Sequence, residues 1–143
     1  CQGIVAYYLL SAVVGWLITW LCPQFQNLND ANVTAMNVQG GALMTFATVF
    51  FVPVAEETLF RGLLFRGLYD RSPLLAWCVS VALFSFVHIA GYIGRYEPLM
   101  LLLAFVQYLP AGLCLAYAHK KADTILAPIL MHIAINQMAM SIL

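Results

Sequence analysis

The chain has 143 residues, of which 64% are hydrophobic and 8% are charged, and its formal net charge is zero. Soluble domains carry about 25% charged residues, so this composition excludes an ordinary soluble protein and indicates an integral membrane protein. The balanced charge offers no basic surface to nucleic acid. We therefore expect the lipid bilayer, and no DNA or RNA, as the surroundings of the chain.

Five apolar segments follow one another, and each approaches the length of about 20 residues that crosses the hydrocarbon core as a helix. They cover about residues 4–21, 42–69, 73–90, 98–118 and 125–143. The third has a clear start, because Ser72 suits an N-cap and Pro73 suits the first helical position. The expected fold is an all-α, polytopic transmembrane helix bundle. Because the chain begins at Cys1 and stops directly after an apolar run, we expect it to be part of a larger bundle.

The basic residues between the segments predict an orientation. Arg66 and Arg71 flank the connection between the second and third segments, and Lys120 and Lys121 lie between the fourth and fifth. Among the connections on the other side, the only basic residue is Arg95. Because cytoplasmic loops are enriched in Lys and Arg, both basic connections and the visible N-terminus are predicted to lie inside the cell.

The second segment carries three charged residues near its middle: Glu56, Glu57 and Arg61. A charged residue at the centre of a bilayer costs about 2.5–3.5 kcal/mol on insertion scales. Glu57 and Arg61 are four residues apart, so they share one face of the helix and can form a supporting ion pair. Glu56 is rotated by about 100° around the helix and is left without this partner. A membrane helix that keeps such a cluster must pair it or use it.

Two further pairs with a spacing of four lie in other segments: Phe84 with His88, and His132 with Asn136. Each pair sits in an otherwise apolar helix. A bundle that brings these two faces against the face of Glu57 would build a single polar pocket within the membrane. The sequence therefore predicts one site assembled from three helices.

The residue types in this pocket suit hydrolysis. Glu56, a carboxylate left without an ion-pair partner in an apolar segment, is the candidate for a general base near neutral pH. His88 could share the proton or orient a water molecule. His132 and Asn136 together offer two donors to the oxyanion that forms when a carbonyl is attacked. Water is the expected attacking group.

Zinc is the alternative at the same positions. Glu56, His88 and His132 would supply the two histidines and one glutamate of a known catalytic set. The helical His-Glu-x-x-His signature is absent, so any such zinc site would be assembled across helices. The residues alone leave both accounts open.

Each feature on its own also has a purely structural interpretation. A Glu–Arg pair can be a buried ion pair, and a lone histidine or a His–Asn pair can hydrogen bond between membrane helices. Tyr108 and Met131 are most simply core or lipid-facing residues. It is the combination of three motifs, each in its own predicted helix, that favours a functional site.

The order of these motifs resembles the CPBP family of intramembrane proteases. This family comprises the CAAX proteases, including the Rce1-type prenyl-protein endopeptidases, and the bacteriocin-processing Abi proteins. The matching motifs are Glu-Glu-Thr-Leu-Phe-Arg at residues 56–61, Phe-x-x-x-His at 84–88 and His-x-x-x-Asn at 132–136. The resemblance covers about residues 45–140. We expect residues 42–143 to form the CPBP/Abi-like catalytic core and residues 1–41, which match no motif, to form a first transmembrane helix with a polar external loop.

The resemblance implies peptide-bond hydrolysis by an all-helical intramembrane fold. It gives Glu56 and His88 the activation of water, and it gives His132 and Asn136 the oxyanion site. Members are often called metalloproteases, and a metal-free, glutamate-activated water is the competing account. The expected substrate is a membrane-anchored protein or peptide, and the short connections indicate a bacterial plasma membrane.

Two other functions are compatible with the same pocket. One is a non-catalytic membrane scaffold or a bacteriocin self-immunity protein that uses the pocket for binding. The other is a transporter with a proton-coupled carboxylate, which the absence of a detectable inverted repeat in the sequence disfavours. Because the chain retains every residue of the three motifs, we expect an endopeptidase.

Overall fold

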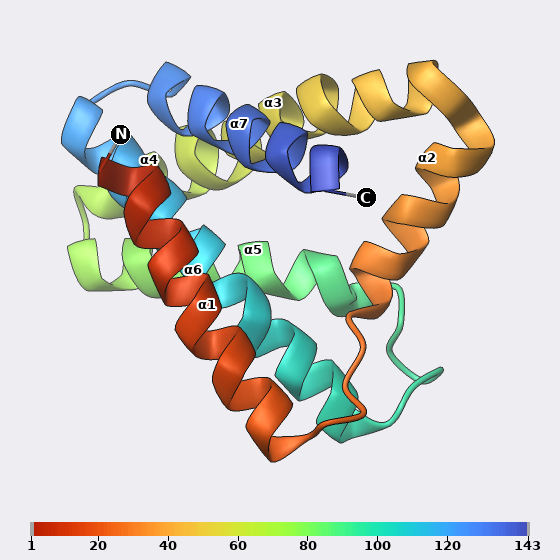
Figure 1. Cartoon of the computed structure of the whole chain (residues 1–143). Coiled ribbons are helices and arrows are strands. Elements are labelled where there is room, and N and C mark those ends of the chain that lie inside the picture. Colours follow the sequence, from red (N-terminus) through yellow and green to blue (C-terminus); the bar gives the residue numbers. More distant parts are fainter. Residues whose placement is uncertain (1, 143) are drawn as a thin grey trace.

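The computed structural model describes residues 2–142, and the elements in this range are all helical. Four continuous helices form most of the bundle: α1 (Gln2–Leu21), α5 (Pro73–Ala90), α6 (Pro98–Ala122) and α7 (Leu126–Ile142). Between α1 and α5 lies a long helical stretch made of α2 (Leu28–Phe46), η1 (Ala47–Phe51), α3 (Val52–Glu57), η2 (Thr58–Phe65) and α4 (Arg66–Tyr69). Helix α6 packs against α5, α1 and α7, so it is central to the bundle (Figure 1).

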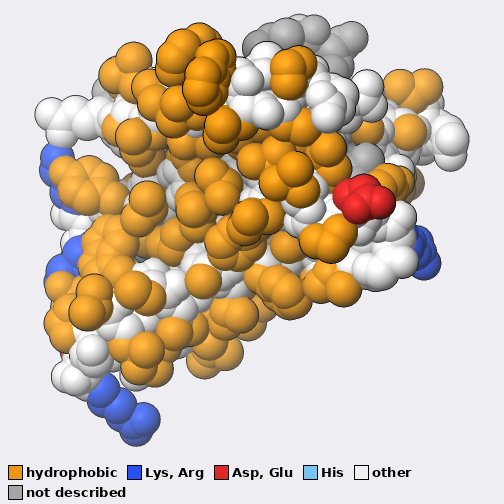
Figure 2. Space-filling model, turned by 90° about the horizontal axis from the view of Figure 1, so that it is seen from below, with side chains coloured by type: hydrophobic (Ala, Val, Ile, Leu, Met, Phe, Trp, Pro, Cys, Tyr) orange, Lys and Arg blue, Asp and Glu red, His pale blue; other side chains and the backbone are white. Residues whose placement is uncertain are grey.

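The lengths of the helices agree with the predicted membrane bundle. By length and composition, Gln2–Leu21, Asn29–Tyr69, Pro73–Ala90 and Pro98–Ala122 can cross a membrane, and the apolar part of α7 is shorter. The exterior agrees as well, because many large hydrophobic side chains face outward, such as Trp16, Trp20 and Leu43. Figure 2 shows one face on which hydrophobic side chains predominate, with Lys and Arg at its edges and acidic side-chain atoms toward its right-hand side. The protein is an integral membrane protein.

The polar stretch predicted as a loop is the main difference from the expected fold. Only residues 22–27 form a connection, and α2 begins at Leu28. Asn27 explains this start, because its side-chain oxygen accepts hydrogen bonds from the backbone N–H groups of Asn29 and Asp30 and so caps the helix. A search for apolar runs overlooks such a helix, because its early residues are mostly polar.

A sharp bend in α2 falls at the predicted boundary between residues 41 and 42. Gly41 has φ 58° and ψ −152°, a conformation that is essentially restricted to glycine. The helical stretch changes direction here before it enters the segment with the glutamates (Figure 1). Replacement of Gly41 by any residue with a Cβ atom would therefore strain the backbone at this bend.

The two predicted basic connections lie at the same end of the bundle. The ammonium group of Lys120, at the end of α6, lies 4.3 Å from the centre of the Tyr69 ring at the end of α4. Lys121 donates a hydrogen bond to Gln2 at the start of α1. The end of α4, the end of α6 and the start of α1 therefore share one side, as the predicted topology requires.

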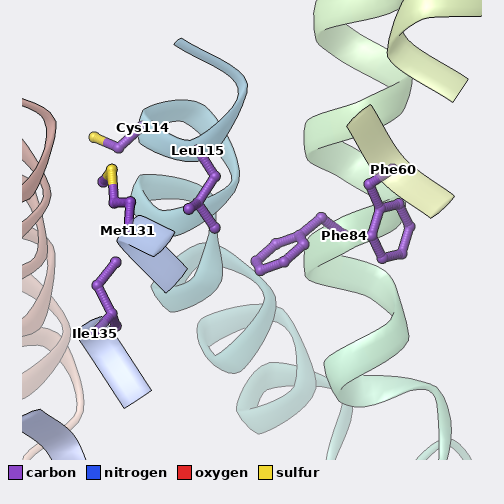
Figure 3. Close-up of a cluster of buried hydrophobic side chains, with 6 residues drawn as sticks. All are labelled: Phe60, Phe84, Cys114, Leu115, Met131 and Ile135. Atoms are coloured by element: carbon purple, nitrogen blue, oxygen red, sulfur yellow. The ribbon is translucent and has the colours of Figure 1, made fainter. Parts of the chain in front are cut away.

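A buried cluster of apolar side chains from four elements forms the core of the bundle. Phe60 and Phe84 meet edge to face with their ring centres 5.6 Å apart, and Met131 belongs to the same buried cluster, which confirms it as a core residue. The full cluster, drawn in Figure 3, is Phe60, Phe84, Cys114, Leu115, Met131 and Ile135. It holds η2, α5, α6 and α7 together beside the charged residues.

Gly112 permits the close contact between α5 and α6, and we predict that Gly112→Ala destabilises the bundle. A Cβ atom at this position would lie 3.1 Å from Val81 Cγ1 and 3.4 Å from both Cα and O of Val81. Small residues allow membrane helices to approach closely, and overpacking costs about 1–3 kcal/mol. Thermal unfolding in detergent should therefore occur at a lower temperature.

The matched control for this substitution is Gly15→Ala. Gly15 also lies within a long helix, but nothing is within 4 Å of the added Cβ atom. This variant should unfold at the temperature of the unchanged protein or slightly above it. Equal unfolding temperatures for both alanine variants would contradict the proposed role of Gly112 in packing.

Candidate active site

The helix that carries the glutamates is wound unusually, and this winding holds Asn136 in place. In η1 the N–H of Val52 donates to the carbonyl of Ala47, five residues earlier, as in a π-helix. In the same register the donor to the carbonyl of Thr48 would be residue 53, which is Pro53 and has no N–H. The side-chain amide of Asn136 donates to this free carbonyl at 3.0 Å. This hydrogen bond therefore joins α7 to η1 at the edge of the site.

Glu57 and Arg61 form a fully buried ion pair. Arg61 Nη1 lies 3.1 Å from Glu57 Oε1, and both side chains have 0% relative exposure. Arg61 Nη2 also donates to the carbonyl oxygen of Gly112 at 2.8 Å, and its guanidinium carbon lies 4.6 Å from the centre of the Phe84 ring. Arg61 therefore ties η2 to α5 and α6.

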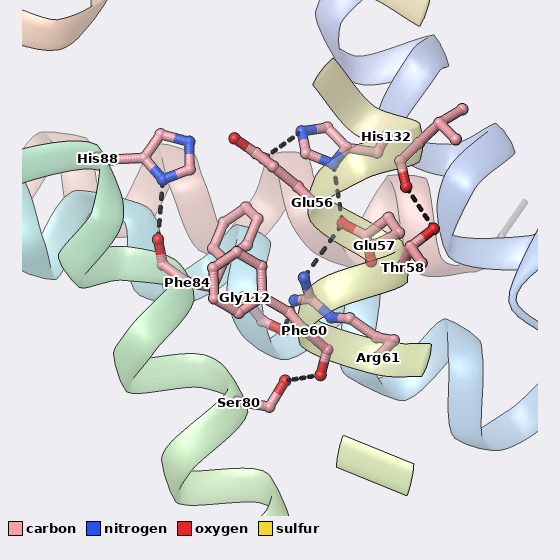
Figure 4. Close-up of polar contacts among 11 residues, drawn as sticks. Glu56, Glu57, Thr58, Phe60, Arg61, Ser80, Phe84, His88, Gly112 and His132 are labelled. Atoms are coloured by element: carbon pink, nitrogen blue, oxygen red, sulfur yellow. Dashed lines mark hydrogen bonds and ion pairs between the residues drawn. The ribbon is translucent and has the colours of Figure 1, made fainter. Parts of the chain in front are cut away.

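His132 joins this pair from α7. Its Nδ1 lies 2.9 Å from Glu57 Oε1, and its Nε2 lies 3.8 Å from Glu56 Oε2. Figure 4 shows the His132 ring between the two glutamates, with Arg61 beyond Glu57. Because a carboxylate accepts hydrogen bonds, we assign a hydrogen to Nδ1 of His132. The contact of 3.8 Å is too long for a hydrogen bond, so Glu56 lies beside His132 without a direct hydrogen bond to it.

Glu56 differs from Glu57 in its surroundings. Its side chain is 20% exposed and lines the cavity described below, whereas Glu57 lies behind the cavity wall. Within the described part of the chain, Oε2 of each glutamate is buried without a hydrogen-bond partner, but Oε1 of Glu57 contacts both Arg61 and His132. Of the two adjacent carboxylates, Glu57 is held in the structure and Glu56 is available to a ligand.

His88 lies on α5 and faces the same cavity. Its Nδ1 is 2.8 Å from the backbone carbonyl of Phe84. Since a carbonyl oxygen only accepts, Nδ1 carries the hydrogen, and Nε2 is free to accept a proton or a hydrogen bond. Ser85, one turn earlier on the same helix, is buried and does not line the cavity. A serine nucleophile beside His88 is therefore not presented to the cavity.

A cavity of about 450 Å³ is lined by predicted site residues from three helices. This volume falls in the usual range of about 300–1,000 Å³ for ligand pockets. Glu56, His88, His132 and Asn136 all line it. The arrangement presents one free carboxylate, one free imidazole nitrogen and two further polar side chains to whatever enters, which is a set suited to acid–base chemistry.

The three residues suggested as zinc ligands, Glu56, His88 and His132, do not come together as a metal-binding group. Among residues 2–142, no group of three His, Cys, Asp or Glu side chains lies close enough together to hold a metal ion. Nδ1 of His132 and Nδ1 of His88 are both engaged by protein oxygens, so only Nε2 of each ring is left for a metal, and the two do not form such a group with Glu56. The arrangement of Glu56, His88 and His132 does not fit a zinc ion, and we derive no step through a metal.

Three parts of the site were not predicted from the sequence. The carbonyl of Thr48 and the carbonyl of Gly112 are backbone groups, which residue types do not reveal. Tyr108, expected to be a core or lipid-facing residue, instead lines the cavity and stacks on His88. One signal was present: Gln107, Tyr108, Ala111 and Leu115 follow a helical spacing, and all four line the cavity.

The fold and this site together define a polytopic helical membrane protein with a polar cavity inside the bundle. A family model described as "Type II CAAX prenyl endopeptidase Rce1-like" matches residues 38–138. The chain therefore belongs to the Rce1-like family of membrane proteases, as the resemblance of its motifs predicted. No curated protein and no solved structure matched the sequence.

Proposed function

We propose that the chain is an intramembrane endopeptidase that hydrolyses a peptide bond with water activated by Glu56 and His88. The observation that carries this proposal is the shared cavity, whose wall presents Glu56, His88, His132 and Asn136 from three different helices. Membership of a protease family supports the same reaction class. The separation of the paired Glu57 from the free Glu56 supports the choice of base.

The proposed reaction proceeds through one water molecule between Glu56 and Nε2 of His88. Glu56 takes one proton from the water, and the second O–H of the water donates a hydrogen bond to Nε2 of His88. The water oxygen then attacks the carbonyl carbon of the peptide. The resulting oxyanion receives hydrogen bonds from His132 and Asn136. The C–N bond then breaks, and the proton held by Glu56 passes to the leaving amine. The products are one carboxylic acid and one amine.

This role requires a particular charge on His132. Its Nδ1 hydrogen is directed at Glu57, so a hydrogen on Nε2, which the oxyanion needs, makes the ring a cation. With this cation, the charges of Glu56, Glu57, Arg61 and His132 sum to zero. A buried group with no net charge is the least costly arrangement within a membrane.

The proposed substrate is a membrane-associated protein or peptide, because the site lies inside a bundle whose outer surface is apolar. We further propose that the chain resides in a bacterial plasma membrane with its visible N-terminus in the cytoplasm. The basic residues at the ends of α4 and α6 lie on the side of the start of α1, and the positive-inside rule assigns that side to the cytoplasm.

The decisive experiment compares peptides from two cell populations. One produces the unchanged protein and the other produces Glu56→Gln, and membrane-bound and secreted peptides are identified by mass spectrometry. A peptide or protein that stays uncut only in the variant cells would establish the protease and identify its substrate. Matching peptide sets, together with rescue of a deletion strain by the variant, would favour a scaffold or immunity protein that only binds through the cavity.

Asn136→Ala should lower kcat on the identified substrate by about 10²–10³ with little change in KM, since loss of one oxyanion donor has this effect. The variant also loses the hydrogen bond to the carbonyl of Thr48, which should cost about 1 kcal/mol of stability. The measurement is steady-state kinetics alongside thermal unfolding. The control is Gln137→Ala, because Gln137 is the next residue on α7 and is exposed. A raised KM with unchanged kcat would mean that Asn136 binds substrate rather than the oxyanion.

A further inference from the structure

His88 is held in an unusual way for a residue that must handle a proton. Its only hydrogen bond among the described residues is to the carbonyl of its own helix, at Phe84. The rest of its support is aromatic: the Phe84 ring centre lies 4.8 Å away at 46°, and the Tyr108 ring centre lies 4.2 Å away at 27°. Tyr108 belongs to α6, so the closest support of the imidazole comes from another helix.

Tyr108 is in turn held by the start of α2. Its hydroxyl donates to the carboxylate of Asp30 and accepts a hydrogen bond from Asn29 Nδ2 at 3.1 Å. Asn27, which caps α2, donates to Gln107 at 2.9 Å. These bonds join the residues that begin α2 to the residue pair on α6 that faces the cavity. The family match begins only at residue 38, so Asn27, Asn29 and Asp30 lie outside it, whereas Tyr108 lies within it.

A histidine with one hydrogen bond can turn about χ2, because rotation about that bond has a broad energy profile. A stacked ring restricts this rotation and keeps Nε2 directed into the cavity. The Tyr108 ring also faces the imidazole, and an aromatic face attracts the partial positive charge that develops on the imidazole as Nε2 accepts a hydrogen bond from the water. Donation of the Tyr108 hydroxyl to a carboxylate increases the electron density of that ring.

We propose that Tyr108 is a positioning residue that fixes the ring plane of His88, and that Asp30 and Asn29 hold Tyr108 in place from α2. The inference rests on the proposed function, because it assigns His88 to the activation of water. It adds the start of α2 to the catalytic apparatus as a support that touches neither the substrate nor the water. Small errors in the position of a catalytic group lower rates by about 10²-fold, which sets the scale of the expected effect.

The test compares Tyr108→Leu, which removes the ring, with Tyr108→Phe, which keeps the ring and loses the hydroxyl. Tyr108→Leu should lower kcat about ten- to a hundredfold with KM nearly unchanged, and Tyr108→Phe should recover most of this loss. Asp30→Ala, which releases the hydroxyl without altering the ring, should lower kcat by a smaller factor. The control is Tyr117→Leu, since Tyr117 lies on the same helix and is exposed.

A second measurement separates positioning from a general loss of structure. With ¹⁵N-labelled histidine, the unchanged protein should show His88 with its hydrogen on Nδ1, and Tyr108→Leu should show a mixture of both tautomers. If Tyr108→Leu unfolds, Asp30→Ala should show the same change in smaller measure. An unaltered His88 spectrum in a folded Tyr108→Leu protein, unchanged kcat, or a Tyr108→Phe protein as slow as Tyr108→Leu would overturn the proposal.

The two measurements also separate this inference from the proposed function. If the unchanged protein cleaves no peptide, the proposed function fails, whereas the ¹⁵N spectra still report whether Tyr108 orients the His88 ring. If cleavage depends on Glu56 but neither kcat nor the spectrum depends on Tyr108, the protease stands and the positioning role is wrong.

Discussion

Glu56→Gln is expected to lower the rate of peptide hydrolysis by about 10²–10⁴ and to leave the protein folded. Glutamine keeps the shape of the side chain but cannot take a proton from water. The structural cost should be small, because Glu56 is partly exposed to the cavity and its Oε2 makes no hydrogen bond to the described residues. The rate is measured with purified protein and the identified substrate, and the fold is followed by thermal unfolding in detergent.

Glu97→Gln is the matched control for this substitution. Glu97 lies at the start of α6 and is exposed, so the same chemical change there should alter neither rate nor stability. Full activity of Glu56→Gln would show that another group removes the proton. A loss of activity with a lower unfolding temperature would instead place Glu56 among the residues that hold the bundle together.

Arg61→Met should have the largest effect on stability. Methionine occupies a similar length but carries no charge, so the fully buried carboxylate of Glu57 loses its ion pair, and the carbonyl of Gly112 loses its donor. Removing one partner of a buried ion pair typically costs about 3–5 kcal/mol. The free energy of unfolding in detergent, or the unfolding temperature, measures this loss.

The double variant Glu57→Gln/Arg61→Met separates charge from packing. It removes both charges, so it should be more stable than Arg61→Met alone, because no unpaired charge stays buried. Arg66→Met is the control, since Arg66 is exposed one turn after Arg61, and surface changes usually stay within about 0.5 kcal/mol. Unchanged stability of Arg61→Met would contradict a stabilising role for the pair.

The predicted helices were mostly correct where apolar runs define them. The segments expected at 4–21, 73–90 and 98–118 correspond to α1, α5 and α6, and Ser72 caps α5 as predicted, with its side chain accepting a bond from the N–H of Leu75. The helix from Leu28 to Gly41 was missed because it is polar, and its start depends on the side chain of Asn27. A capping residue is a weaker signal than 20 apolar residues.

The sequence by itself determined the contacts within single helices. Residues four apart share a face, so the ion pair of Glu57 with Arg61 followed from their spacing. The sequence also determined that the protein is a membrane protein of this family, because composition and the order of three motifs are properties of the chain alone.

Only the tertiary structure decided the contacts between helices. It directed Nδ1 of His132 to Glu57, gave the carbonyl of Thr48 to Asn136, and set Tyr108 against His88. These contacts depend on how closely and at what angle the helices cross, which the packing at Gly112 and the bend at Gly41 control. Residue spacing along one helix contains no information on that crossing, because it arises from side chains far apart in the sequence.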